Sequence, residues 1–140
     1  MRITRGAVVA MLGAVLLVSG CKQDKIEEKY HPAKLEESGE KGIMRVILEP
    51  KAAERIGLQT AQVAEQNGRK VVPYGAIMYD TKGDTWTFTN PQPLVFVRHK
   101  VVVEHIEGDQ VVLSDGPAAG TAIVTVGATE LMGAEHKYGH

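Results

Sequence analysis

Short apolar runs separated by turn-forming residues make up most of the chain after residue 42. Each run has the length of a strand and is too short for a helix of ordinary length. The runs occupy residues 43–48, 58–64, 71–78, 86–89, 101–106, 111–113 and 122–126. Only residues 50–57 depart from this pattern, because Pro50 at the first position and Gly57 at the end are typical of a short helix. Ala53 and Ile56 would then face inward.

Glycine, asparagine and aspartate mark the connections between these runs. Residues 66–68 (Gln-Asn-Gly) are a turn signal. Three further segments each join two apolar runs in the manner of a hairpin, namely residues 81–84, 107–110 and 114–120. Residues 90–93, which contain two prolines, break the middle of the pattern. Because small open sheets leave unpaired edges, we expect a mainly β fold over residues 43–133, a small barrel or roll with one short helix.

The N-terminal segment has the pattern of a secretory signal. Arg2 and Arg5 precede an uncharged apolar run at residues 7–18. As a helix this run would span roughly 18 Å, too short for a bilayer core of about 30 Å. Residues 18–21 (Val-Ser-Gly-Cys) resemble the bacterial lipobox, in which the signal is removed before a cysteine that then carries diacylglycerol. We expect a signal peptide at residues 1–20 and lipidation of Cys21, the alternative being an ordinary signal peptide with an incidental cysteine.

The anchor predicts a place in the bacterial cell envelope, facing the periplasm or the exterior, and leaves open which membrane holds it. Residues 21–42 are dominated by lysine, glutamate, glycine and serine, with few side chains to bury. Such a segment is typical of a flexible tether, although residues 33–37 have some helical propensity. We expect a second flexible segment, the histidine-containing tail, at residues 134–140.

Composition and charge exclude several classes of function but do not identify one. The 140 residues are 44% hydrophobic and 24% charged, as in one ordinary globular domain. The formal net charge of −1 predicts no basic surface for nucleic acid. The single cysteine excludes an internal disulfide. Ser114 lies in a Ser-Asp-Gly-Pro turn, where we expect its side chain to cap the backbone. A catalytic nucleophile needs a base and an orienting acid beside it, and the sequence offers no such arrangement. We therefore do not expect an enzyme.

Two groups of residues are candidates for binding. Met132, His136 and His140 could hold copper or zinc, because the two imidazoles share one face if the segment is helical. The alternative is a solvated polar tail without any cofactor. Trp86 shares a strand face with Phe88, and we expect both in the core. As the alternative, Trp86 and Arg98 form an interaction surface.

Three sequence segments, taken in their order along the chain, resemble a known protein family. They are residues 48–63 (LEPKAAERIGLQTAQV), residues 72–77 (VPYGAI) with Trp86, and residues 96–98 (FVR) with the glycines at 108, 116, 120 and 127. They are similar to the periplasmic adaptor subunits, or membrane fusion proteins, of resistance-nodulation-division efflux pumps. In that family the segments form the membrane-proximal β domain, and a lipoyl-like domain, a long α-hairpin and a β-barrel domain separate the first segment from the second. Here only eight residues separate Val63 from Val72.

The resemblance implies a function without catalysis. A chain without the α-hairpin would not reach an outer-membrane channel and would retain the part that meets a transporter. The resemblance therefore implies a lipid-anchored accessory or remnant module of an efflux or export system. Such a module would dock to a resistance-nodulation-division transporter or to a full-length adaptor. The alternatives are an envelope copper or zinc lipoprotein that uses the His/Met tail, and a structural lipoprotein without a link to transport.

Overall fold

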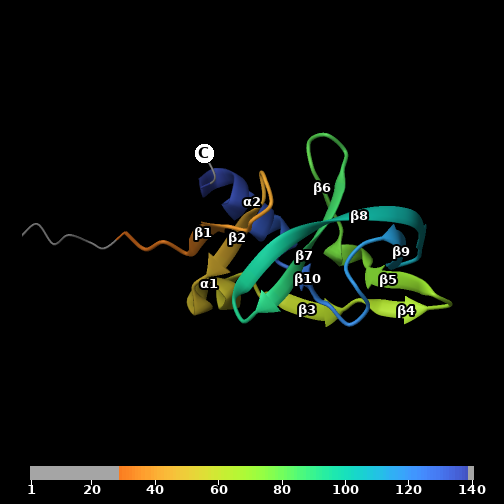
Figure 1. The fold of residues 1–140 in the computed structure, drawn as a ribbon. Coiled ribbons are helices and arrows are strands. Elements are labelled where there is room, and N and C mark those ends of the chain that lie inside the picture. The colour runs from red at the N-terminus through yellow and green to blue at the C-terminus, as the bar shows by residue number, and fades with distance from the viewer. Residues whose placement is uncertain (1–28, 139–140) are drawn as a thin grey trace, which may run out of the picture.

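The computed structural model describes residues 29–138, which contain ten strands, two α-helices and one 3-10 turn (Figure 1). The strands are β1 (Ala33–Glu37), β2 (Met44–Leu48), β3 (Gln59–Gln62), β4 (Ala64–Gln66), β5 (Arg69–Pro73), β6 (Met78–Tyr79), β7 (Thr85–Gln92), β8 (Val95–Glu107), β9 (Gln110–Asp115) and β10 (Ala122–Val126). The helical elements are α1 (Pro50–Arg55), η1 (Tyr74–Ala76) and α2 (Ala128–Tyr138).

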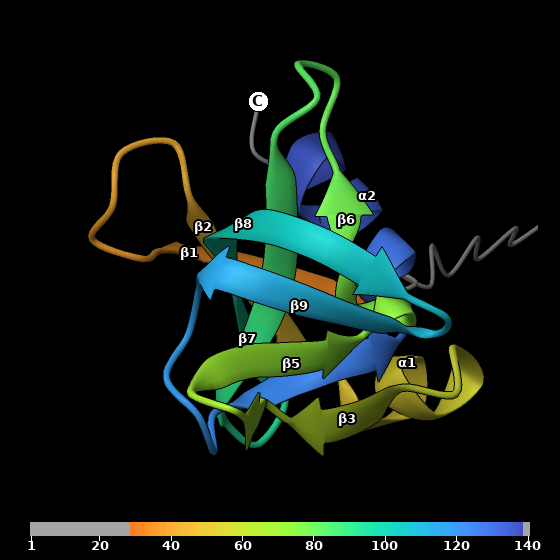
Figure 2. The ribbon, with the colours of Figure 1, turned by 90° about the vertical axis from the view of Figure 1, so that its right-hand side faces the viewer.

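The sheet nearly closes on itself as a barrel. Its strands follow the order β3-β10-β7-β8-β9-β5-β4, and every neighbouring pair is antiparallel. β3 and β4 stand at the two ends of this path, yet only Val63 separates them in the chain. The Val63 amide donates to the Thr121 carbonyl at 2.9 Å, and its own carbonyl accepts from the Gly120 amide at 2.8 Å. The expected mainly β, barrel-like fold is confirmed (Figure 2).

The long strand β8 connects the barrel to the rest of the molecule. β7 pairs along one edge of β8, while β2 and then β9 pair along the other. Register shifts between Val102 and His105 bend β8 where it passes from one set of neighbours to the next. β1 pairs with β2 and so extends the sheet beyond the barrel.

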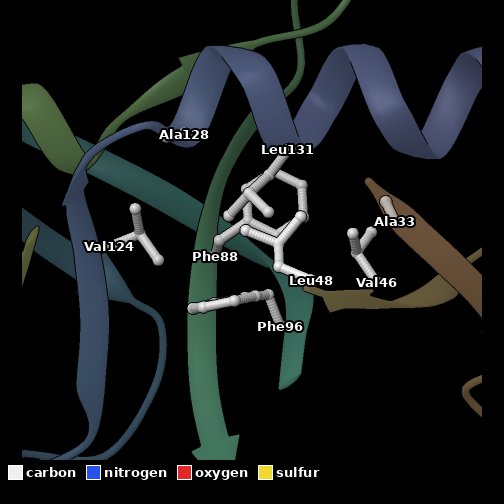
Figure 3. Close-up of a cluster of buried hydrophobic side chains, with 8 residues drawn as sticks. All are labelled: Ala33, Val46, Leu48, Phe88, Phe96, Val124, Ala128 and Leu131. Carbon is white, nitrogen blue, oxygen red and sulfur yellow. The ribbon is translucent and has the colours of Figure 1, made fainter. Parts of the chain in front are cut away.

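Buried apolar side chains form two clusters, on opposite faces of the barrel strands. The barrel core consists of Val63, Val72, Ala76, Ile77, Val101, Val111, Leu113 and Ile123. The outer core lies beneath α2 and consists of Ala33, Val46, Leu48, Phe88, Phe96, Val124, Ala128 and Leu131 (Figure 3). The neighbours Ile123 and Val124 belong to different clusters, because side chains alternate along a strand.

Several local predictions are confirmed. The expected helix at residues 50–57 is α1, with Pro50 in its first turn and Ala53 and Ile56 packed against the outer core. The turn at residues 66–68 joins β4 to β5, and Asn67 and Gly68 have φ values of 51° and 72°. Both positive values suit a hairpin turn that follows the twist of its strands. The connections at residues 81–84 and 107–110 are also hairpins, between β6 and β7 and between β8 and β9.

Two other local predictions are wrong. Residues 114–120 are no hairpin, because β9 pairs with β5 and β8 while β10 pairs with β3 and β7. The turn residues specify a change of direction, but closure of the barrel decides which strands become neighbours. Residues 90–93 do not break the sheet either, because β7 extends to Gln92 and Leu94, with φ 61°, turns the chain into β8.

The expected domain boundary at residue 43 lies too late in the chain. Residues 33–37, expected within a flexible tether, form β1, where Ala33 is buried in the outer core. The segment is strand rather than helix because β2 offers it a complete ladder, from Ala33 opposite Leu48 to Glu37 opposite Met44. Residues 21–28 lie outside the described part of the chain.

The expected boundary at residue 133 lies too early. α2 continues to Tyr138, so the segment from residue 134 onward begins as helix rather than as a flexible tail. Ala134 packs against the outer core, and Glu135 is buried. These contacts stabilise a segment whose composition alone would favour solvent.

Candidate functional site

Helix α2 and the β6–β7 hairpin enclose a groove on one side of the barrel. Its volume is about 390 Å³. Figures 1 and 2 show the loop of this hairpin projecting beyond the barrel, with α2 beside its base. The hairpin contributes Met78, Tyr79, Asp80 and Thr81, and the helix contributes Thr129, Met132, Gly133 and His136. We call this feature the α2 groove.

Asp80 fixes the shape of the hairpin wall. Its Oδ1 accepts hydrogen bonds from the backbone amides of Lys82 at 2.8 Å and Asp84 at 2.9 Å, and its Oδ2 accepts from Trp86 Nε1 at 3.0 Å. Burial alone would raise the pKa of Asp80, but these three hydrogen bonds and the charge of Lys82 outweigh it and hold the pKa below its usual value. The loop is therefore built around an ionised carboxylate.

Trp86 lies under two cations. The Arg98 guanidinium carbon lies 4.4 Å from the centroid of its ring, and Lys100 Nζ lies 5.8 Å from it. The expectation of two core aromatics is confirmed for Phe88, which is fully buried. It is wrong for Trp86, which is half-buried because its indole N–H must reach Asp80.

Arg98 binds within the molecule on its other side. Its Nε donates to Glu135 Oε1 at 2.9 Å, and its NH2 group donates to the Gly42 carbonyl at 2.6 Å. Glu135 Oε1 also accepts from the Met44 amide at 3.0 Å. The two side chains are 12% and 4% exposed. Arg98 therefore ties α2 to β8 and to the β1–β2 hairpin, and it is not presented as a free cation on the surface.

Two of the three expected metal ligands lie in the α2 groove. Met132 is half-buried against the outer core, and His136 is exposed one turn further along α2. His136 Nδ1 lies 2.8 Å from the Met132 carbonyl oxygen. His140 lies outside the described residues. Within the described residues, no three side chains of histidine, cysteine, aspartate or glutamate gather closely enough to hold a metal ion.

An exposed tyrosine that lines the groove, Tyr79, interacts with a second exposed tyrosine, Tyr74. The side chain of Tyr79 is hydrogen-bonded to that of Tyr74 in η1. Burial raises the pKa of Tyr79, and the charge and the hydrogen bond of Tyr74 raise it further. Both side chains remain about half exposed, at 53% and 48%. They form a polar and aromatic rim beside a more apolar groove.

Sequence reasoning missed Met78, Tyr79, Asp80 and Glu135. One signal for α2 was present, because Leu131, Met132 and Ala134 have a helical apolar spacing and His136 and Lys137 follow in the last turn. Gly127 and Gly133 obscured this signal. The meeting of Met78 with α2 had no local signal, because it follows from the path of the whole sheet.

Cys21 lies outside the described residues, and over residues 29–138 no helix has both the length and the apolar character needed to cross a membrane. No protein-family model matches the chain, and comparison with curated proteins finds no match.

Proposed function

We propose that this protein is a lipid-anchored docking module of the bacterial envelope, acting by binding rather than by turnover. Its partner is a resistance-nodulation-division transporter or a full-length periplasmic adaptor. Cys21 carries the anchor, and the α2 groove with its tyrosine rim meets the partner. The observation that carries the proposal is the exposed Tyr79 at this groove, together with the exposed Tyr74 that interacts with it.

The chemistry of the rim supports a protein partner. Tyrosine is enriched at protein interfaces because it offers a large contact area and a hydrogen-bonding end at a low entropic cost. The wall that carries Tyr79 is held by the bonds of Asp80 and Trp86. A surface that is already ordered loses less free energy on binding than a mobile one.

The anchor supports a partner close to the membrane. Only eleven residues separate Cys21 from Ala33, where β1 begins. Even fully extended, they span no more than about 40 Å. The barrel would therefore stay within reach of the periplasmic face of a membrane transporter. The resemblance to the membrane-proximal adaptor domain supports the same class of partner.

Two tyrosine variants test the proposal. Tyr79 and Tyr30 are similarly exposed, at 53% and 50%, but Tyr30 lies at the N-terminal end of the described chain beside Arg55. The lipidated chain would be co-expressed with the transporter and adaptor of its own organism and purified in mild detergent. We expect Tyr79→Ser to reduce co-purification of one of them about tenfold or more, and Tyr30→Ser to leave it unchanged. Equal yields for both variants and the unsubstituted chain would contradict the proposal.

A further inference from the structure

We propose that the α2 groove is a binding site for a soft monovalent metal ion, copper(I), held by the thioether sulfurs of Met78 and Met132 and by Nε2 of His136. This inference does not rest on the docking function, although both are assigned to the α2 groove. It rests on three donors that line one cavity from two elements far apart in the sequence.

The three donor residues line the groove from two different elements. Met132 and His136 stand four positions apart on α2, so they occupy the same face of the helix one turn apart. Met78, at the start of β6, lines the opposite wall. Met78 and Met132 are both half-buried and pack against the outer core, which restrains their flexible side chains.

His136 is oriented as a metal ligand should be. A carbonyl oxygen can only accept a hydrogen bond, so the 2.8 Å contact with the Met132 carbonyl requires the proton on Nδ1. The neutral ring then carries its free lone pair on Nε2. Histidine ligands in metal sites generally donate their other N–H to a carbonyl or carboxylate in this way, which fixes the tautomer and the ring orientation.

The donor set selects the class of metal. Thioether ligands favour copper(I), whereas zinc is bound by thiolate, imidazole and carboxylate. Asp80 is the carboxylate of the groove, and both of its oxygens already accept hydrogen bonds from N–H donors. Apart from the hydroxyl groups of Tyr79, Thr81 and Thr129, the side chains of the groove offer two thioethers and one imidazole as donors. The site therefore differs from the one expected from sequence, because Met78 replaces His140.

The test uses the chain from residue 21 onward, which contains every described residue, with Cys21→Ala to remove the thiol. This chain has three methionines, Met44, Met78 and Met132. Silver(I) serves as a redox-inert probe, and the ¹³C-labelled methionine methyl groups are followed by NMR. One equivalent should shift the methyl signals of Met78 and Met132 and leave that of Met44 in place. Absence of both shifts, or an equal shift of Met44, would overturn the proposal.

Affinity measurements with copper(I) and a competing chelator complete the test. Met78→Leu and Met132→Leu keep the side-chain volume and should each weaken binding about tenfold or more. His136→Gln should do the same. Met44→Leu and His99→Gln, at a methionine and an exposed histidine outside the groove, should have no effect. Binding that depends on His140 and persists in Met78→Leu would place the site in the tail and overturn the proposal.

Discussion

Thr87 is a polar side chain buried without a hydrogen-bond partner. It has no exposed surface, and its Oγ1 contacts no donor or acceptor among the described residues. Its neighbours two positions away on β7 differ, because Thr85 Oγ1 donates to the Val101 carbonyl at 2.7 Å and Thr89 Oγ1 donates to the Val97 carbonyl at 2.9 Å. An unpaired buried hydroxyl destabilises the folded state, whereas a paired one contributes to it.

Replacing Thr87 with valine should therefore stabilise the protein. The substitution keeps the shape and removes the buried hydroxyl, so we expect the free energy of unfolding to rise by about 1 kcal/mol. Thr89→Val is the matched control and should lower the same quantity by about 1 kcal/mol, because it deletes a hydrogen bond. Urea unfolding followed by circular dichroism measures both. If the two variants change stability in the same direction, the assignment of these hydroxyls is wrong.

The β6–β7 hairpin should lose stability in acid through Asp80. Its pKa lies below the usual value of about 3.9, so its contribution to folding is complete above about pH 4 and is lost as the pH falls through the folded-state pKa. Trp86 donates to this carboxylate, so the fluorescence of the single tryptophan reports the change.

A titration of stability against pH from 5 to 2.5 checks this prediction. Asp80→Asn should flatten the acid dependence of the unfolding free energy and abolish the associated change in Trp86 fluorescence. Asp109→Asn, in the turn between β8 and β9, should leave both unchanged. An acid transition that is identical in Asp80→Asn would show that another group causes it.

An ion pair and an apolar face hold helix α2 to the barrel. Ala128 and Leu131 supply the apolar face, and Glu135 supplies the ion pair with Arg98. Breaking a buried pair leaves one uncompensated charge away from water, which costs more than the pair contributes. The helix and the groove that it borders therefore depend on Glu135.

We expect Glu135→Ala to lower the free energy of unfolding by about 3–5 kcal/mol, and Arg98→Ala to have an effect of similar size. Arg69→Ala breaks the exposed pair between Arg69 and Glu104 and should cost less than about 1 kcal/mol. Thermal and urea unfolding measure all three. If Glu135→Ala lowers the free energy of unfolding no more than Arg69→Ala does, the buried Arg98–Glu135 ion pair does not stabilise the fold as proposed.

Elements defined by local chemistry were predictable from the sequence, and elements defined by distant partners were not. Pro50, Gly57, Asn67 and Gly68 act on their immediate neighbours, so α1 and the β4–β5 turn follow from them. β1 has few apolar residues and exists because β2 pairs with it, whereas α2 depends on Arg98, thirty-seven positions before Glu135. At the candidate site, Met132 and His136 were identifiable as a local pair, but Met78 reaches them only through the sheet.

At the scale of the whole molecule, one continuous segment closes the barrel and another enlarges it. The β3–Val63–β4 segment joins the two ends of the sheet. The β1–β2 hairpin extends the sheet through the pairing of β2 with β8, and it contributes Ala33, Val46 and Leu48 to the outer core. The folded unit therefore includes β1 as well as α2.

A fragment of residues 30–140 should be more stable than one of residues 43–140. The shorter fragment lacks the ladder of β1 and the burial of Ala33 and Leu35, so we expect its free energy of unfolding to be about 2–3 kcal/mol lower. Both should give β-type circular dichroism spectra with a chelator present, because the barrel core contains none of the deleted residues. Equal stability of the two fragments would contradict the place of β1 in the fold.

The central claim is that the face bearing the α2 groove meets an efflux or export partner. Site-specific photo-crosslinking in living cells tests it most directly, with a photoreactive amino acid at Thr81 in the β6–β7 hairpin or, as control, at Asn67 in the β4–β5 turn. Both positions are exposed. We predict that Thr81 forms an adduct containing peptides of a resistance-nodulation-division transporter or of a full-length adaptor, and that Asn67 does not. Absence of such an adduct from Thr81, or equal adducts from both positions, would contradict the proposed function.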